Sequence, residues 1–204
     1  INLALSTRGL HALEQAGLAD RVRQRSINMP GRIIHTLDGD THFQPYGVNP
    51  SDVLYAISRA ELQNLLLDAL THHPKARIAF EARCVEVDTD NQTLTLSHTG
   101  TGSHANTGKT TTLRRQRIIA ADGASSAARL AMWRTPRFNY SQTYLEHGYK
   151  ELTIPAAADG AFQLEPHALH IWPRGAYMLI ALPNLDGSFT CTLFMPFDGA
   201  VSFA

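Results

Sequence analysis

The sequence predicts a mixed α/β (α+β) fold in which an α/β domain is interleaved with a domain built on an antiparallel sheet. One observation is the run of small apolar residues at 118–121. This run ends in Asp122-Gly123 and a helix start, and it is typical of a strand covered on both faces. A second observation is the helical spacing of leucines before this turn. A third is the change to strand-like alternation after Tyr140.

Composition and charge exclude several classes of function. The 204 residues include 18 lysines and arginines and 18 aspartates and glutamates. The chain therefore lacks the net positive charge that is typical of nucleic-acid-binding proteins. Cys84 and Cys191 lie far apart and indicate neither a disulfide framework nor a zinc site. No apolar run reaches 18 residues, and we expect a cytoplasmic chain. Because the sequence opens on Ile1 without a methionine, we also expect it to be a piece of a longer protein.

The first predicted elements are a helix and a hairpin. Leucines at near-helical spacing predict a helix of roughly ten residues that Ser6 caps and Gly17 ends. The turn Asp38-Gly39-Asp40 joins two alternating segments, 32–37 and 41–44, and predicts a β-hairpin. The leucines of the helical pattern are Leu3, Leu5, Leu10, Leu13 and Leu18.

A further strand is expected at 53–57, directly before a second helix. Ser58-Arg59-Ala60-Glu61 matches a capping box that opens this helix, and Pro74 terminates it. Three short strands should follow, at 76–80, 84–88 and 93–96.

Residues 97–112 are polar and rich in glycine, serine and threonine, which predicts a loop. The loop contains Gly108-Lys109-Thr110, but position 103 is Ser and Gly102 lies one place too early for a phosphate-binding loop. After the loop, strands are expected at 149–154, 169–172, 177–182 and 189–194, with a turn at 184–187 between the last two.

These elements predict two interleaved domains. Residues 1–29 and 58–135 form the α/β domain, and 30–57 and 136–204 form the sheet domain. The second domain is thus built from two insertions into the first, and its sheet can present one face to a ligand.

The Asp122-Gly123 turn is a candidate binding site. Gly123 permits a sharp turn, and Ser125 or Ser126 can cap the following helix. A strand end that meets a helix N-terminus is where α/β sheets place phosphate and ribose groups. An ordinary surface turn is an equally good interpretation of these residues. Structural roles are favoured for the histidines His72, His73, His167 and His170, and no metal site is expected.

Arg32 and Tyr46 are candidates for binding a carboxylate. Both lie on or next to the predicted hairpin, which can bring a guanidinium and a phenol towards one point. The alternative is that both side chains are solvated on the surface. No side chains suited to acid–base catalysis are found in a convincing setting, so an enzyme of this sequence would rely on a bound cofactor.

Several segments together resemble the kynurenine 3-monooxygenase family of FAD-dependent aromatic hydroxylases. The narrowest matches are His147-Gly148-Tyr149-Lys150-Glu151-Leu152, Leu169-His170-Ile171-Trp172-Pro173 and Ile180-Ala181-Leu182-Pro183-Asn184. Supporting matches are the start of the chain from Ile1 to Gly9, the tetrapeptide Gln44-Pro45-Tyr46-Gly47, and Ala121-Asp122-Gly123 followed by Ser126 and Arg129. The resemblance covers nearly the whole chain except 97–112.

The resemblance implies a p-hydroxybenzoate-hydroxylase-like fold with a partial, Rossmann-like FAD-binding domain. It implies hydroxylation of L-kynurenine by FAD with NADPH and oxygen, so that the flavin carries the chemistry and no side chain is catalytic. By the same resemblance the substrate-binding residues are Arg32, Tyr46, Leu54, Leu169, Met178, Ile180, Leu182 and Phe194. The FAD-binding residues are Ala4, Arg59, Cys84, Asp122, Gly123 and Ala127, with Arg59 near the pyrophosphate.

Two departures from the family pattern limit what the resemblance implies. Ala120 replaces the glycine that is usual two places before the aspartate. The Gly-rich first βαβ unit, the later Gly-Asp motif and the segment that completes the substrate pocket are missing, so we expect the activity to belong to a longer parent protein. The alternatives are a related FAD hydroxylase of another aromatic acid, and an inactive relative that binds aromatic acids weakly. For a eukaryotic source, the mitochondrial outer membrane is the alternative location.

Overall fold

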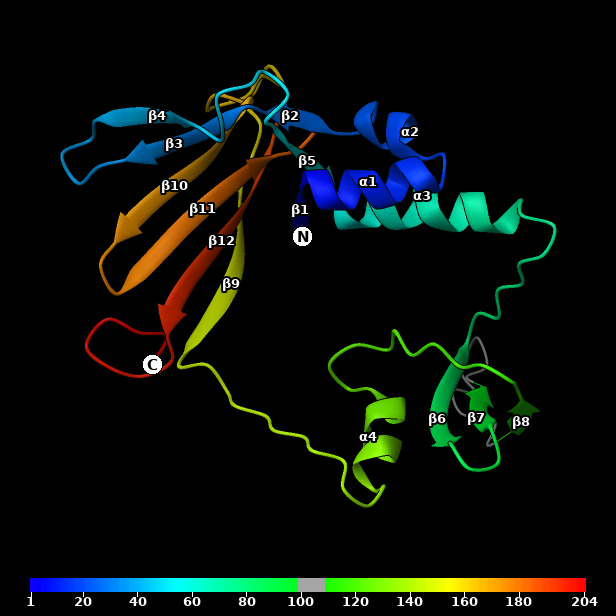
Figure 1. The fold of residues 1–204 in the computed structure, drawn as a ribbon. Helices are drawn as coiled ribbons and strands as arrows, with labels where there is room; N and C mark the ends of the chain where they lie inside the picture. Colours follow the sequence, from blue (N-terminus) through cyan, green and yellow to red (C-terminus); the bar gives the residue numbers. More distant parts are fainter. Residues whose placement is uncertain (99–108) are drawn as a thin grey trace. The chain divides into compact units, whose positions relative to one another are not determined.

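The chain divides into two units (Figure 1). The first contains residues 1–76 and 145–204, and the second contains residues 77–144. The computed structural model describes residues 1–98 and 109–204, so the centre of the predicted loop, with Gly108, lies outside the described residues. The boundaries between the units, at 76/77 and 144/145, differ from the predicted domain boundaries at 29/30, 57/58 and 135/136. The assignment of a function to each predicted domain stays a prediction.

The first unit is built on a six-stranded sheet with the order β4-β3-β10-β11-β12-β9. The predicted hairpin and the four predicted C-terminal strands are all confirmed as members of this sheet. Neighbouring strands of this sheet pair antiparallel, except for β3 and β10, which pair in parallel. This parallel pair joins segments more than 130 residues apart in the sequence. The strands are β3 (Gly31–His35), β4 (Thr41–Pro45), β9 (His147–Ile154), β10 (Ala168–Arg174), β11 (Tyr177–Pro183) and β12 (Phe189–Pro196).

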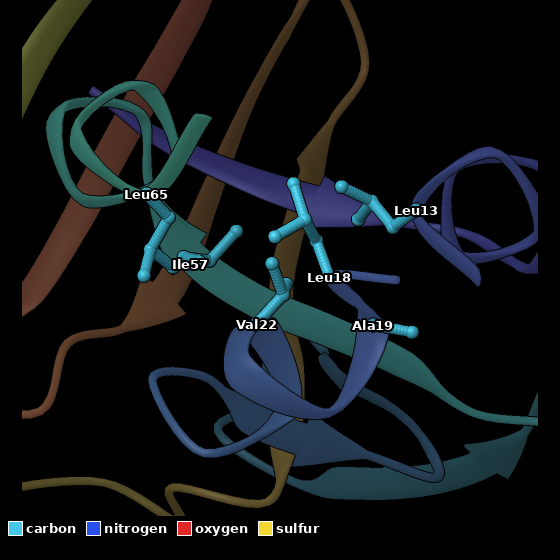
Figure 2. Packing of buried hydrophobic residues seen from close by; sticks show 6 residues of the cluster. All are labelled: Leu13, Leu18, Ala19, Val22, Ile57 and Leu65. Atoms are coloured by element: carbon cyan, nitrogen blue, oxygen red, sulfur yellow. The ribbon is translucent and has the colours of Figure 1, made fainter. Parts of the chain in front are cut away.

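A three-stranded sheet and three helices complete this unit. The sheet has the order β1-β5-β2, and the helices pack beside β1 and β5 (Figure 1). Figure 2 shows their common core, which contains the buried residues Leu13, Leu18, Ala19, Val22, Ile57 and Leu65. The elements are β1 (Asn2–Leu5), α1 (Thr7–Gln15), α2 (Ala19–Arg23), β2 (Ile27–Met29), β5 (Leu54–Ser58) and α3 (Arg59–Thr71). None of the described helices is long and apolar enough to cross a membrane.

Two local predictions in this unit were partly wrong. Leu3 and Leu5 belong to a strand and not to the first helix, because β1 pairs with β5 along its whole length. Ser58 is the N-cap residue of α3, but its side chain makes no capping hydrogen bond. Glu61, the other half of the predicted capping box, instead forms an ion pair of 3.3 Å with Arg25. A Glu61 carboxylate that pairs with Arg25 does not complete the reciprocal capping box.

The second unit contains an antiparallel three-stranded sheet and one short helix. Its strands β6 (Ala82–Asp88), β7 (Thr93–His98) and β8 (Thr110–Arg114) follow one another in space as in sequence. Helix α4 (Ala127–Trp133) packs against β6. Residues 97–98 and 110–112 of the predicted loop are therefore strand and not loop, because the backbone ladder pairs β7 with β8. The prediction of a strand at 76–80 is wrong, since this segment has no regular structure and no strand partner among the described residues.

The buried strand predicted at 118–121 is also wrong. These residues have no regular structure, and the side chain of Ile119 is 86 % exposed. A continuous apolar run becomes a buried strand only when neighbouring strands and helices cover both of its faces. No described strand pairs with this segment, so the sequence pattern is present without the sheet that it normally belongs to.

Candidate functional site

The candidate site lies on one face of the six-stranded sheet. Successive side chains of a strand point to opposite faces, so residues two apart share a face. Arg32 on β3 lies opposite Leu169 on β10, and both therefore project to the same side. Continuing across the sheet, Ile180 on β11 pairs with Thr192, and Met178 pairs with Phe194 on β12. The face thus carries Arg32 at the β3 end and the apolar side chains of Leu169, Ile180 and Met178 beyond it.

Arg32 is positioned by the hairpin that the turn at 38–40 closes. It lies opposite Gln44 in the β3–β4 ladder, and its Nε donates a hydrogen bond of 2.8 Å to Oε1 of Gln44. Gln44 was not among the predicted site residues. A single glutamine has no periodicity of its own, but its offset of two residues from Tyr46 was a usable signal that the two share a face.

Tyr46 follows β4 directly and continues its pairing. Its backbone N–H donates to the carbonyl oxygen of Pro30 at 3.1 Å. Its hydroxyl group is buried and has no hydrogen-bond partner among the described residues. Burial raises the pKa of the Tyr46 phenol, and the nearby positive charge of Arg32 opposes part of this rise. A buried hydroxyl without a partner destabilises the folded state by about 1–3 kcal/mol. The Tyr46 hydroxyl is therefore suited to donating a hydrogen bond to a ligand.

The Tyr46 side chain packs against an apolar cluster. Ile27, Met29, Ala56 and Leu182 form its buried centre. Tyr46, Leu54, Phe162, Leu169 and Ile180 pack against that centre. Five predicted substrate residues, Tyr46, Leu54, Leu169, Ile180 and Leu182, are therefore brought together by the structure. Phe162 was missed by sequence reasoning, because it lies in an irregular segment where no periodic pattern marks a buried face.

The remaining predicted substrate residues lie on the same sheet face but outside this cluster. Arg32 adjoins the cluster through its register partner Leu169. Met178 and Phe194 lie opposite each other near the far end of β11, and the Phe194 ring is 6.2 Å from the ring of Tyr149. The face thus has a cationic end, an apolar centre and an aromatic end, which suits a ligand with a carboxylate and an aromatic ring.

Two of the predicted cofactor residues lie in the first unit. Ala4 is exposed on β1, one of the two edge strands of its sheet, where it lies opposite the buried Ala56. Arg59 is exposed and is the first residue of α3, and its backbone N–H donates to the carbonyl oxygen of Ile1 at 3.1 Å. A guanidinium at the N-terminus of a 13-residue helix adds to the positive end of the helix dipole. This arrangement suits a phosphate group.

The other four predicted cofactor residues lie in the second unit. Cys84 is followed by a β-bulge, and its thiol donates weakly to the carbonyl oxygen of Glu86 at 3.6 Å. Ala127 is the first residue of α4 and lines a hollow of about 340 Å³ between this helix and β6. Gly123 has a φ of +73°, as the predicted sharp turn requires.

Asp122 uses both of its carboxylate oxygens inside its own turn. Oδ1 accepts a hydrogen bond of 2.6 Å from the Ser126 hydroxyl, and Oδ2 accepts one of 3.3 Å from the backbone N–H of Ala128. The bond from Ser126, helped by the bond from Ala128, lowers the pKa of the Asp122 carboxyl. Ser126 in turn accepts from the backbone N–H of Arg129 at 2.9 Å, which confirms it as the helix cap.

The four histidines that were expected to be structural all make hydrogen bonds within the chain, and His73 accepts one from the backbone N–H of Lys75 at 3.3 Å. His170 is 2 % exposed and bonds through Nδ1 to His35 and through Nε2 to the carbonyl oxygen of Glu165, at 2.8 and 2.9 Å. His72 bonds to the carbonyl oxygen of Asp68, and His167 bonds to that of Asn28. In the described part of the chain, no group of three or more histidine, cysteine, aspartate or glutamate residues is arranged to hold a metal ion.

Comparison with known proteins gives a family model and a set of named relatives. The model of the FAD binding domain matches residues 3–157. A Myxococcus xanthus protein named kynurenine 3-monooxygenase is 48 % identical over 205 residues, covering all of this chain and 43 % of the relative. Proteins of the same name from Flavobacterium psychrophilum and Dictyostelium discoideum are 48 % and 43 % identical, and the chain covers 44 % and 42 % of them. The chain therefore spans less than half the length of these relatives.

Solved structures share the fold at low sequence identity. A p-nitrophenol 4-monooxygenase from Pseudomonas putida has a TM-score of 0.74 at 15 % identity, over 98 % of this chain and 48 % of that protein. A salicylate hydroxylase in complex with its substrate has a TM-score of 0.68 at 17 % identity, over 98 % of this chain and 49 % of that protein. At these identities the likeness establishes a common fold only.

Proposed function

Because the chain belongs to the FAD binding domain family, we propose that it supplies the substrate-binding sheet and part of the flavin site of a kynurenine 3-monooxygenase. The family makes FAD the cofactor. Relatives at 42–48 % identity over the whole chain, all named kynurenine 3-monooxygenase, support the substrate. In this reaction one atom of O₂ enters the ring of L-kynurenine and the other leaves as water, while NADPH supplies two electrons.

The observation that carries the proposal is the buried hydroxyl of Tyr46, which has no hydrogen-bond partner in the described part of the chain, beside the charge of Arg32. L-Kynurenine has a carboxylate at one end and an aromatic ring at the other. The guanidinium and the phenol would bind the carboxylate, since both donate hydrogen bonds to anions. The apolar side chains of Leu169, Ile180 and Leu182 would then contact the ring and keep water from it.

FAD would supply the activation of oxygen, and the chain's own residues would hold and orient the flavin. In the first unit, Arg59 at the helix N-terminus suits the pyrophosphate, and Ala4 leaves room because its side chain is a single methyl group. In the second unit, Gly123 and Ala127 would contribute backbone and small side chains, and Cys84 remains a proposed neighbour of the flavin. Asp122 would act mainly by fixing its turn, because its oxygens already accept hydrogen bonds from Ser126 and Ala128.

A second candidate is a related FAD hydroxylase that acts on another aromatic acid. The carboxylate site and the apolar cluster have features that any aromatic carboxylate would satisfy. The shared fold with a salicylate hydroxylase is compatible with this candidate. For location, the bacterial relatives from M. xanthus and F. psychrophilum support the cytoplasm, and a eukaryotic source would favour the mitochondrial outer membrane.

The test uses the protein translated from the complete reading frame that contains this sequence. We expect L-kynurenine to accelerate NADPH oxidation and to yield 3-hydroxykynurenine. Acceleration by salicylate or p-hydroxybenzoate, with hydroxylation of that acid and none of kynurenine, would favour the second candidate. If FAD binds but no aromatic acid is hydroxylated, the protein is an inactive relative and the proposal fails.

A further inference from the structure

Gln44 and Arg32 form a direct cross-strand pair. They are register partners in the β3–β4 ladder, and Nε of Arg32 donates to Oε1 of Gln44 at 2.8 Å. In the described part of the chain, neither terminal nitrogen of Arg32 donates a hydrogen bond to another residue. The only described hydrogen bond of this guanidinium is therefore the one that Gln44 accepts.

The position of Gln44 is fixed by the close approach of the two strands. Gly31 is buried beside it, and a Cβ at this glycine would lie 2.5 Å from the carbonyl oxygen of Gln44 and 2.6 Å from the ring of Phe43. Only a residue without a side chain permits this contact. Gly31 thus holds the strand that presents Gln44 on the Arg32 side and Phe43 on the other side.

The bond to Nε determines which edge of the guanidinium remains available. A carboxylate can bind in a fork to the side edge, formed by Nε and one terminal nitrogen, or to the end edge, formed by the two terminal nitrogens. The oxygen of Gln44 already uses Nε, which leaves the end edge. A glutamine also has no charge, so it orients Arg32 without cancelling the positive charge that attracts an anion.

We propose that Gln44 is a positioning residue that holds the end edge of Arg32 towards the substrate carboxylate. This proposal rests on the proposed function, since it assumes that Arg32 binds that carboxylate. Gln44 itself does not touch the reacting atoms. Its contribution to affinity is therefore limited to ligands that carry a carboxylate, which separates it from a general role in the stability of the hairpin.

The experiment compares two ligands in the FAD-bound protein from the complete reading frame. L-Kynurenine carries the carboxylate, and 2-aminoacetophenone has the same aryl ketone without the amino-acid group. Gln44→Met keeps the size of the side chain but removes the oxygen acceptor. We expect it to raise the Kd for L-kynurenine about tenfold, with kcat at saturating substrate nearly unchanged and the Kd for 2-aminoacetophenone unchanged.

Two further variants make the result decisive. Gln44→Glu keeps an acceptor but adds a negative charge, so we expect a larger loss, of about 100-fold in the Kd for L-kynurenine. Thr41→Val, on the opposite face of the same strand, should bind both ligands like the wild type. An equal loss for both ligands, or no loss in Gln44→Met, would overturn the positioning role while the proposed function stands. Failure of the wild-type protein to bind L-kynurenine would instead overturn the proposed function.

Discussion

The Arg32–Tyr46 region and the Asp122 turn were both predicted as ligand sites. They differ in whether their polar groups have hydrogen-bond partners within the chain. The Tyr46 hydroxyl is buried and has no described partner. Both carboxylate oxygens of Asp122 are bonded within six residues of the aspartate. Native proteins pair nearly all of their buried polar groups. The first region thus has a buried donor without a partner among the described residues, whereas the acceptors of the second are paired within their own turn.

This difference separates residues that bind from residues that shape a binding loop. The hydrogen bonds of Asp122 and Ser126 set the start of α4, and each carboxylate oxygen of Asp122 already accepts one hydrogen bond from its own turn. Among residues 1–98 and 109–204, Arg32 is held only through Nε, and its two terminal nitrogens donate to no other residue. Substitutions in the first region should therefore change ligand affinity, and substitutions in the second should change local stability.

The largest effect is expected from Arg32→Ala. It should weaken binding of L-kynurenine by about 2–4 kcal/mol, because it removes a charge-assisted contact from a site that the bound ligand shields from water. Arg32→Lys should recover part of the loss, since it restores the charge but not the fork. The measurement is the Kd for L-kynurenine by titration of the FAD-bound protein from the complete reading frame.

A matched control for Arg32→Ala is Arg21→Ala. Arg21 is an exposed arginine whose guanidinium pairs with Asp68 at 2.7 Å, away from the sheet face. We expect its removal to leave the Kd unchanged. An unchanged Kd in Arg32→Ala itself would show that this arginine is not the carboxylate-binding group, and the contrast with the Asp122 turn would disappear.

Tyr46→Phe should have two effects of opposite sign. Without ligand, the free energy of unfolding should stay the same or rise by about 1 kcal/mol, because the variant buries no unpartnered hydroxyl. Binding of L-kynurenine should weaken by about 1.5 kcal/mol, the scale of one hydrogen bond to a charged group. Urea unfolding and ligand titration of the same preparation measure the two quantities. A loss of stability in the ligand-free variant would mean that the hydroxyl has a partner in the folded protein.

Ser126→Ala tests the other side of the comparison. It removes the cap of α4 and a donor to Asp122, and it should destabilise the helix by about 1 kcal/mol. Ser126→Thr keeps the hydroxyl and should restore most of the stability. Hydrogen exchange of the backbone amides of α4, followed by mass spectrometry, measures the local effect. Weaker protection in α4 with an unchanged Kd for L-kynurenine is the expected pattern, and a large change in that Kd would contradict it.

Local patterns accounted for most of what could be predicted from the sequence. The turn at 38–40 and the alternation around it predicted the hairpin that carries Arg32, and Ser126 was one of two predicted caps for α4. Signals of this kind lie within a few residues of the element that they specify. They are therefore visible without any knowledge of distant parts of the chain.

Pairings between distant segments could not be predicted in the same way. The parallel ladder that places Leu169 beside Arg32 depends on two strands whose sequences contain no signal for each other. The same limit explains the error at 118–121, where an apolar run predicted burial but no described strand covers it. Gln44 differs from these cases, since its pairing with Arg32 lies within the predicted hairpin and its offset of two residues from Tyr46 was a local signal that was not used.

The smallest effect is expected from the titration of Asp122, since its carboxylate is exposed and solvent screens its interactions. Its pKa in the folded protein lies below the ordinary value of 3.8, chiefly because of the Ser126 hydroxyl. The stabilisation is therefore fully present above pH 3.8 and is lost as the pH falls through the folded-state pKa. Protection factors of the α4 amides should show this decline in the wild type but not in Asp122→Asn. The same decline in both proteins would assign it to another group and would leave Asp122 available for a ligand.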